Sequence, residues 1–207
     1  MYRTNCLILI SLLGLGLSGC GASRPIKYYT VQVPVAPSPS TNTYSVSLLV
    51  GAIGGPEMLK DTPIAYRIGV NEVGTYQYSR WAEPPVEMLK GKLIRMLRDS
   101  GQYQSVGSLG STAEGGYVVR GRLHEFEEVD SAGSINGLVS MEFELYDRKS
   151  GKVVWSHSYS RSEPVEGKKI SLVVTALDLN LDRGLQEVSA GLGQYFATSV
   201  AKQEAKR

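Results

Sequence analysis

The side chains that could catalyse a reaction or bind a metal are few in this chain. His124 and His157 are its two histidines, and each lies in a stretch that alternates like a β-strand. Glu125 and Glu127 are close to His124 in the sequence, but strand alternation points them to the opposite face. We therefore expect structural roles for both histidines and predict no metal site.

An acidic run continues this stretch, and we expect it to be a solvated strand end, because no neighbouring residue distinguishes one carboxylate as an acid and another as a base. It comprises Glu125, Glu127, Glu128 and Asp130. A dinucleotide-type glycine pattern, Gly14-x-Gly16-x-x-Gly19, has no strand before it and no βαβ unit around it. The sequence has no G-x-S-x-G, P-loop or H-E-x-x-H motif. These observations predict a non-catalytic protein without a cofactor.

The N-terminus carries the most specific chemical signal. A head with one positive charge, Arg3, precedes an apolar run from Cys6 to Leu17 that is too short to span a bilayer. A charged head, a short apolar run and small residues before a cleavage site are typical of a secretory signal. The run ends in Leu17-Ser18-Gly19-Cys20, which resembles the bacterial lipobox, whose cysteine is acylated and becomes the first residue after cleavage.

We accordingly predict a signal peptide over residues 1–19, a lipid on Cys20, and an acylated tether over residues 20–26. The alternative is an ordinary signal peptide whose cleavage site includes a cysteine. Gly21 stands where an Asp would favour retention in the inner membrane. By resemblance to lipoprotein sorting signals, the chain is expected in the outer membrane, facing the periplasm.

The composition limits which partners the chain can bind and which interactions can stabilise the domain. The chain has 22 basic and 20 acidic residues, and this near balance argues against a nucleic-acid partner. Cys6 and Cys20 are its two cysteines. If Cys6 is removed and Cys20 is acylated, no thiol remains for a disulfide, a nucleophile or a metal. No later apolar run approaches membrane-spanning length, so the lipid is the predicted anchor.

The elements that would position these residues form one domain over residues 27–203. β-branched and aromatic content, alternation and turn residues predict strands at 27–33, 44–53, 65–70, 76–81, 117–124, 139–146 and 153–160. A proline-rich loop is expected at 34–42, and a hairpin turn at 147–152. The alternation in the last three strands, with one polar face, is typical of an antiparallel sheet covered on one side.

Two amphipathic helices are predicted to provide that cover. The first begins at Pro84-Pro85 with Leu89, Leu93 and Leu97 on its apolar face. Its basic residues are expected to face solvent; these are Lys90, Lys92, Arg95 and Arg98. The apolar stripe of the second consists of Leu181, Leu185, Val188, Leu192, Tyr195 and Ser199, and its start is left open between 167 and 182. The fold class is α+β: a mostly antiparallel sheet with two amphipathic helices packed on one face.

Tyrosine is unusually frequent, with 12 residues against 3 phenylalanines. Tyrosine suits both protein interfaces and half-buried strand faces. We single out Tyr76, Tyr78, Arg80 and Trp81 as a partner-binding segment. The alternative is that Trp81 and the two prolines only fix the turn from strand to helix.

Two segments resemble the ABC-type transport auxiliary lipoproteins, the family that includes the PqiC-like outer-membrane lipoproteins. Lys27–Val31 (KYYTV) resembles the short aromatic strand that opens the domain in this family. A more specific likeness spans Ile64–Arg67 and Tyr76–Pro85 (YQYSRWAEPP), then continues through Val86–Leu89 to Ser100–Tyr103. The likeness covers nearly all of the chain that follows the tether.

The resemblance implies a non-catalytic outer-membrane lipoprotein of a transport system that moves lipids or other hydrophobic molecules between two membranes. Its implied partners are an ABC transporter and the periplasmic MCE-domain protein that the lipoprotein would dock at the outer membrane. A homo-oligomer is also compatible with it, because the MCE partners are ring-shaped. Two other classes stay open: a stand-alone lipoprotein for envelope integrity or outer-membrane assembly, and an enzyme acting on lipid or peptidoglycan. The enzyme is disfavoured because the sequence has no nucleophile–base or metal constellation.

Overall fold

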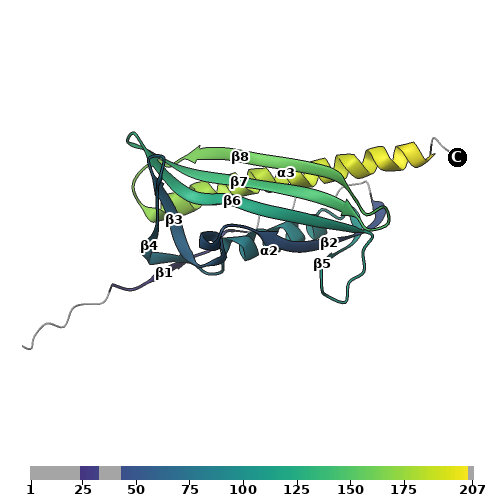
Figure 1. Cartoon of the computed structure of the whole chain (residues 1–207), viewed down its shortest axis with the longest axis horizontal. Helices are drawn as coiled ribbons and strands as arrows, with labels where there is room; N and C mark the ends of the chain where they lie inside the picture. The colour runs from purple at the N-terminus through teal and green to yellow at the C-terminus, as the bar shows by residue number, and fades with distance from the viewer. Residues whose placement is uncertain (1–23, 33–42, 205–207) are drawn as a thin grey trace, which may run out of the picture.

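The computed structural model describes residues 24–32 and 43–204, and Figure 1 shows their arrangement. The predicted signal peptide, Cys20 and the proline-rich loop at 34–42 lie outside the described residues. The strands are β1 (Lys27–Tyr29), β2 (Tyr44–Gly54), β3 (Pro63–Ile68), β4 (Glu72–Trp81), β5 (Tyr103–Ser108), β6 (Tyr117–Ser131), β7 (Ser134–Asp147) and β8 (Lys152–Pro164). The helices are a short 3-10 turn, η2 (Glu57–Lys60), and two α-helices, α2 (Pro85–Asp99) and α3 (Ile170–Glu204).

The strands form one sheet that is organised around the long strand β6. One edge of β6 pairs with β7, which in turn pairs with β8. The other edge is shared by two strands: β2 pairs with the first part of β6, and β3 with the part from Glu127 to Asp130. The longest ladders, β6–β7 and β7–β8, are antiparallel, and so is β3–β4. The pairs β1–β4, β2–β5, β2–β6 and β3–β6 are parallel. The predicted mostly antiparallel sheet is confirmed, with a parallel part that the sequence did not predict.

Both helices cover the same face of this sheet (Figure 1). The inward side chains of β7 are fully or almost fully buried; they are Val139, Met141, Phe143 and Leu145. They pack in one core with the predicted helix stripes, including Leu89, Leu93, Leu181, Leu185 and Leu192. Gly184 allows α3 to approach the sheet closely, because a Cβ there would lie 2.8 Å from the Tyr159 ring. The predicted α+β class, with two helices on one face, is confirmed.

The boundaries of the elements depart from the predictions where long-range pairing decides them. The helix α3 begins at Ile170, so the predicted stripe is only its C-terminal part. The strand β6 continues to Ser131, beyond a bulge between Leu123 and Glu125 that shifts the alternation. The strand β5 was not predicted, because its short polar sequence becomes a strand only through parallel pairing with β2.

Candidate functional site

The four predicted partner-binding residues share the C-terminal half of β4 but differ in exposure. Tyr76 is half-buried, and its hydroxyl donates a 2.7 Å hydrogen bond to Glu128 Oε2. Its ring meets Tyr66 edge to face at 5.3 Å between centroids. Burial, together with the carboxylate of Glu128, raises the pKa of Tyr76 far above its ordinary value, so the hydroxyl keeps its proton. Tyr76 therefore fixes β4 to β6 through a specific polar contact.

Tyr78 and Arg80 are half-buried on the same strand. The Arg24 guanidinium carbon lies 5.8 Å from the centroid of the Tyr78 ring, so the tether contacts this strand. Among the described residues, the Arg80 side chain makes one long contact, 3.5 Å, from Nη1 to Thr62 Oγ1. These two side chains remain partly open to a partner.

Trp81 lies in the core and is 0 % exposed. Its ring centroid is 5.1 Å from that of Phe126 on β6, and its backbone N–H donates to Thr62 O at 2.7 Å. The next residue, Ala82, donates its N–H to Tyr29 O at 2.6 Å, which ties β1 to the turn that leads into α2. Trp81 does not reach the surface, and this geometry favours the alternative in which it fixes the strand-to-helix turn.

The acidic run on β6 is not a solvated strand end, and that expectation was wrong. Glu127 and Glu128 are 5 % and 7 % exposed. Arg67 Nε donates to Glu127 Oε1 at 2.7 Å, and Arg67 Nη2 lies 3.9 Å from Glu125 Oε1. The bulge before Glu125 shifts the alternation of β6, and a buried charge such as Glu127 needs a partner. The cluster joins β3, β4 and β6 and thus braces the β3–β4 hairpin.

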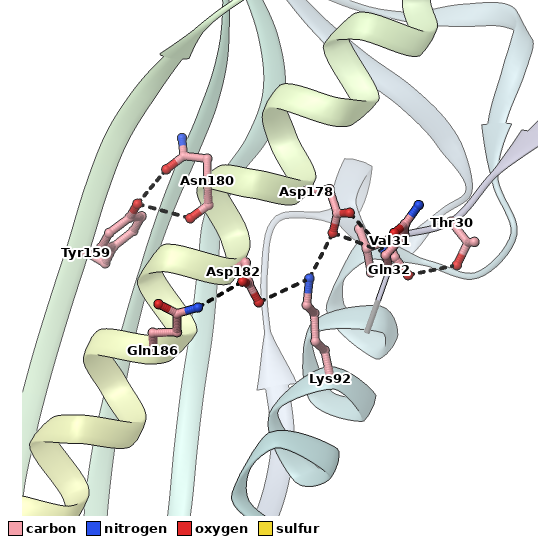
Figure 2. Close-up of polar contacts among 9 residues, drawn as sticks. All are labelled: Thr30, Val31, Gln32, Lys92, Tyr159, Asp178, Asn180, Asp182 and Gln186. Atoms are coloured by element: carbon pink, nitrogen blue, oxygen red, sulfur yellow. Dashed lines mark hydrogen bonds and ion pairs between the residues drawn. The ribbon is translucent and has the colours of Figure 1, made fainter. Parts of the chain in front are cut away.

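A second polar cluster connects the tether side of the molecule to both helices, as Figure 2 shows. Lys92, on α2, is 3 % exposed at its side chain, and its Nζ lies 2.8 Å from Asp178 Oδ1 and 3.7 Å from Asp182 Oδ1 on α3. Asp178 also accepts the backbone N–H of Gln32, at 3.1 and 3.2 Å to its two oxygens. One carboxylate therefore holds α2 and the segment after β1 together.

Sequence reasoning placed Lys92 on the solvated face of its helix, and that expectation was wrong. Lys92 follows Leu89 by three positions and precedes Met96 by four, so it shares a helix face with two buried residues. That spacing was the available signal. It could not reveal the partner, because Asp178 belongs to a helix far away in the sequence.

Figure 2 also shows a buried polar group on the sheet side of α3. Asn180 is 1 % exposed, and its Oδ1 accepts a 2.6 Å hydrogen bond from the Tyr159 hydroxyl. Its Nδ2 donates to Gly137 O on β7 and to Arg161 O on β8, at 2.9 and 2.6 Å. The amide thus fixes the position of α3 on two strands. It is a satisfied structural contact without a reactive partner.

The two histidines lie on different strands and face different carboxylates. His124 Nε2 is 3.4 Å from Glu142 Oε1, and His157 Nε2 is 3.4 Å from Glu187 Oε2. His157 also stacks on Trp155, with 6.0 Å between ring centroids. Within residues 24–32 and 43–204, no three His, Cys, Asp or Glu side chains are grouped so that they could hold a metal ion.

A groove of about 800 Å³ lies between the start of β2 and the loop from β5 to β6. Its lining is mostly polar and includes Ser45, Ser47, Gln104, Ser111, Glu114 and Arg148. Arg148 donates to Gly115 O at 2.9 Å and so fixes the loop. The groove brings together no nucleophile with a base.

No helix in the described part of the chain is long and apolar enough to cross a membrane.

Comparison with known proteins gives the class to which this fold belongs. Residues 29–189 match the family described as the ABC-type transport auxiliary lipoprotein component. The match covers most of the chain, so the protein belongs to this family. It is therefore a membrane-associated envelope lipoprotein of an ABC-type transport system, and the family is described by an auxiliary role rather than by an enzymatic activity. No curated protein sequence matches the chain.

Solved structures show how widely the fold occurs. A crystal structure of a protein from Xanthomonas campestris, assigned to the family DUF330, is 20 % identical, with a TM-score of 0.76 and coverage of 85 % of this chain and 99 % of that chain. A hypothetical protein from Chlamydia trachomatis is 11 % identical, with a TM-score of 0.52 and coverage of 75 % and 99 %. At these identities the likeness concerns the fold alone.

Proposed function

We propose that this chain is a non-catalytic outer-membrane lipoprotein that docks a periplasmic MCE-domain protein and its ABC transporter for the transport of hydrophobic molecules between two membranes. The observation that carries the proposal is the family match over residues 29–189, together with the lipobox that ends in Cys20. Cys20 is the proposed site of lipidation. An acyl-modified cysteine holds a domain at a membrane, because each buried methylene stabilises attachment by about 0.8 kcal/mol.

The described residues support a binding role over a catalytic one. Several buried polar residues of the described domain are engaged with each other: Lys92 with Asp178, Glu127 with Arg67, and Asn180 with Tyr159. Such contacts stabilise a scaffold and leave no activated group for chemistry. A scaffold of this kind can present a surface to a partner without changing its own shape.

Within the predicted partner-binding segment, the geometry favours Tyr78 and Arg80 as the residues that contact the partner. Both are half-buried on β4 next to the tether, and the Arg80 side chain makes one long contact among the described residues. Arg is enriched at interfaces because its guanidinium forms several directional hydrogen bonds. Tyr76 and Trp81 would hold this part of β4 in position through their contacts with Glu128 and Phe126.

Site-specific photocrosslinking in intact cells tests this function. A photoreactive amino acid at Arg80 is expected to crosslink to an MCE-domain protein, identified by mass spectrometry. The same group at Ser156, an exposed position on β8, is the matched control. Crosslinks from Arg80 only to outer-membrane proteins, with the transporter expressed, would instead support the stand-alone envelope lipoprotein.

A further inference from the structure

More than half of the exposed large apolar side chains of the described domain lie near β1 or on the β3–β4 hairpin. Nine large hydrophobic residues in the described part of the chain are exposed, and five of them lie on β1, its preceding residues or the β3–β4 hairpin. These five are Ile26, Tyr28, Ile68, Val70 and Val73. Val70, at the hairpin turn, is 84 % exposed. Ile26 and Tyr28 lie beside the C-terminal end of β4, whereas Ile68, Val70 and Val73 lie together at the hairpin turn. Single exposed apolar residues are ordinary, but three at one turn indicate an interaction surface.

The hairpin turn holds Val70 in a fixed, outward position. Gly69 adopts φ +60°, which suits glycine, and its N–H donates a 2.9 Å hydrogen bond to Asp130 O on β6. Arg67, two residues before it, is anchored by Glu127. The turn is therefore braced by the neighbouring strand, and the side chains of Ile68, Val70 and Val73 are exposed.

The tether joins the domain at the end of β4 that is opposite to this turn. β1 pairs with β4 in parallel, with Lys27 opposite Ser79 near the C-terminal end of β4. Arg24 over the Tyr78 ring agrees with this placement. Tyr78 and Val73 are five strand residues apart, which is about 17 Å. Cys20 is four residues before Arg24, so it lies within about 14 Å of it in any conformation.

The charges beside the tether also fit an anionic lipid surface. Arg24 and Lys27 are exposed next to the predicted anchor. Basic residues close to a bilayer are attracted by anionic headgroups. Glu72, at the start of β4, pairs with Ile68 and is an opposing charge at the turn.

We infer that this end of the molecule rests on the bilayer that holds the acyl chains, with Ile68, Val70 and Val73 entering the boundary between headgroups and hydrocarbon. The inference rests on the proposed lipidation of Cys20. An apolar hairpin tip within reach of a lipid anchor fixes the orientation of the domain, because the anchor alone leaves rotation about the tether free. Tyr78 and Arg80 would then lie at a defined height above the membrane, facing the partner.

Spin-label accessibility in vesicles tests this orientation. Full-length acylated Val70→Cys protein would be reconstituted into vesicles of phosphatidylethanolamine and phosphatidylglycerol and labelled with a nitroxide. The new cysteine is the single free thiol once Cys20 is a thioether. The matched control is Leu109→Cys, because Leu109 is 49 % exposed and its N–H bonds to Val50 O. Val50 pairs with Val119 on β6, and Ile68 pairs with Asp130, about 35 Å further along the same strand. Leu109 is therefore far from the hairpin.

The measured quantity is the ratio of the label's collision rate with oxygen to its collision rate with a water-soluble nickel complex. We expect this ratio to be several-fold higher at Val70 than at Leu109. Equal, water-like accessibility at both positions, in protein that floats with the vesicles, would overturn the inference and leave the anchor standing. Protein that fails to float would overturn the lipidation and the inference with it. A label at Val70 that is shielded only when the transport partner is added would reassign the hairpin to protein docking.

Discussion

Lys92 Nζ and Asp178 Oδ1 are 2.8 Å apart, and they join two helices that the sequence separates widely, with the lysine side chain 3 % and the aspartate side chain 20 % exposed. The same carboxylate accepts the backbone N–H of Gln32, just after the strand that follows the tether. The pair therefore joins the segment after β1 to the helical layer. It holds the N-terminal segment in place, so that the direction of the tether is defined by the core of the domain.

Lys92→Met is expected to destabilise the protein by about 3 kcal/mol, because breaking a buried pair leaves Asp178 without its cation. Arg95→Met is the matched control on the same helix. Arg95 is 64 % exposed at its side chain and lies 3.7 Å from Asp99, so its loss should change the free energy of unfolding by no more than about 0.5 kcal/mol. Urea denaturation of both variants measures the difference. Equal effects would show that the buried pair contributes nothing beyond a surface pair.

Trp81→Ala is expected to cost about 3–5 kcal/mol, because it removes a fully buried indole from the contact with Phe126. Arg80→Ala, one residue earlier, should leave the thermal midpoint nearly unchanged and reduce crosslinking to the partner. Thermal melting and photocrosslinking from a photoreactive amino acid at Tyr78, applied to both variants, separate a structural residue from a contact residue. A folded Trp81→Ala protein that melts like the unmodified protein but has lost its partner would contradict the structural role.

The periodic part of the fold was accessible from the sequence. Both helices and the long alternating strands follow from residue spacing, because one buried face imposes a period on the sequence. The hairpin turn at 147–152 was predicted correctly, and β7 and β8 meet there, with Asp147 paired to Lys152. The prolines at 84 and 85 marked the start of α2 correctly.

The polar interior was not accessible in the same way. Lys92 and Glu127 are charged residues of the kind that is typical of a solvated face. Each is buried because a partner from a distant segment neutralises its charge. The bulge near Glu125 shifts the alternation of β6, and no local residue signals it. The partner-binding segment was predicted from its aromatic residues, but the strand sequence alone did not indicate that Trp81 points inward. The role of Tyr78 and Arg80 in partner binding stays a prediction.

Two buried tyrosines are expected to respond oppositely to loss of the hydroxyl. Tyr159→Phe should destabilise the protein by about 1–2 kcal/mol, because Asn180 Oδ1 loses its 2.6 Å hydrogen bond. The Tyr103 hydroxyl is buried and has no hydrogen-bond partner among the described residues. Tyr103→Phe should therefore be neutral or stabilising by up to about 1 kcal/mol. Chemical denaturation of the two variants provides the comparison, and a costly Tyr103→Phe would reveal a partner for that hydroxyl.

Stability is expected to fall at alkaline pH. Burial raises the pKa of Tyr103 well above its ordinary value, and burial with the nearby Glu128 does the same for Tyr76. Above a pH of about 10 the unfolded chain releases these protons while the folded protein keeps them, so the free energy of unfolding decreases as pH rises. Denaturation curves at a series of pH values should show a shallower decrease for Tyr103→Phe. An unchanged slope would mean that other groups cause the alkaline loss.

Two helix glycines should give opposite results when replaced by alanine. Gly91, in α2, has nothing within 4 Å of a Cβ built on it, so Gly91→Ala should stabilise the protein by about 0.5–1 kcal/mol through helix propensity. At Gly184, in α3, the same atom would lie 2.2 Å from Met141 Cε and 2.8 Å from the Tyr159 ring. Gly184→Ala should therefore destabilise by about 1–3 kcal/mol, because overpacking outweighs the gain in propensity.

The Met141 side chain is flexible and can move, but the Tyr159 ring is held by Asn180, so the clash at Gly184 is not relieved by a single rotation. Adding Met141→Ala to Gly184→Ala tests this reasoning, since it removes only the flexible contact. If Gly184→Ala lowers the free energy of unfolding by nearly as much in the Met141→Ala background as in the unmodified protein, the ring sets the distance between α3 and the sheet. Full recovery would show that Met141 alone sets that distance and that α3 tolerates a closer side chain against Tyr159.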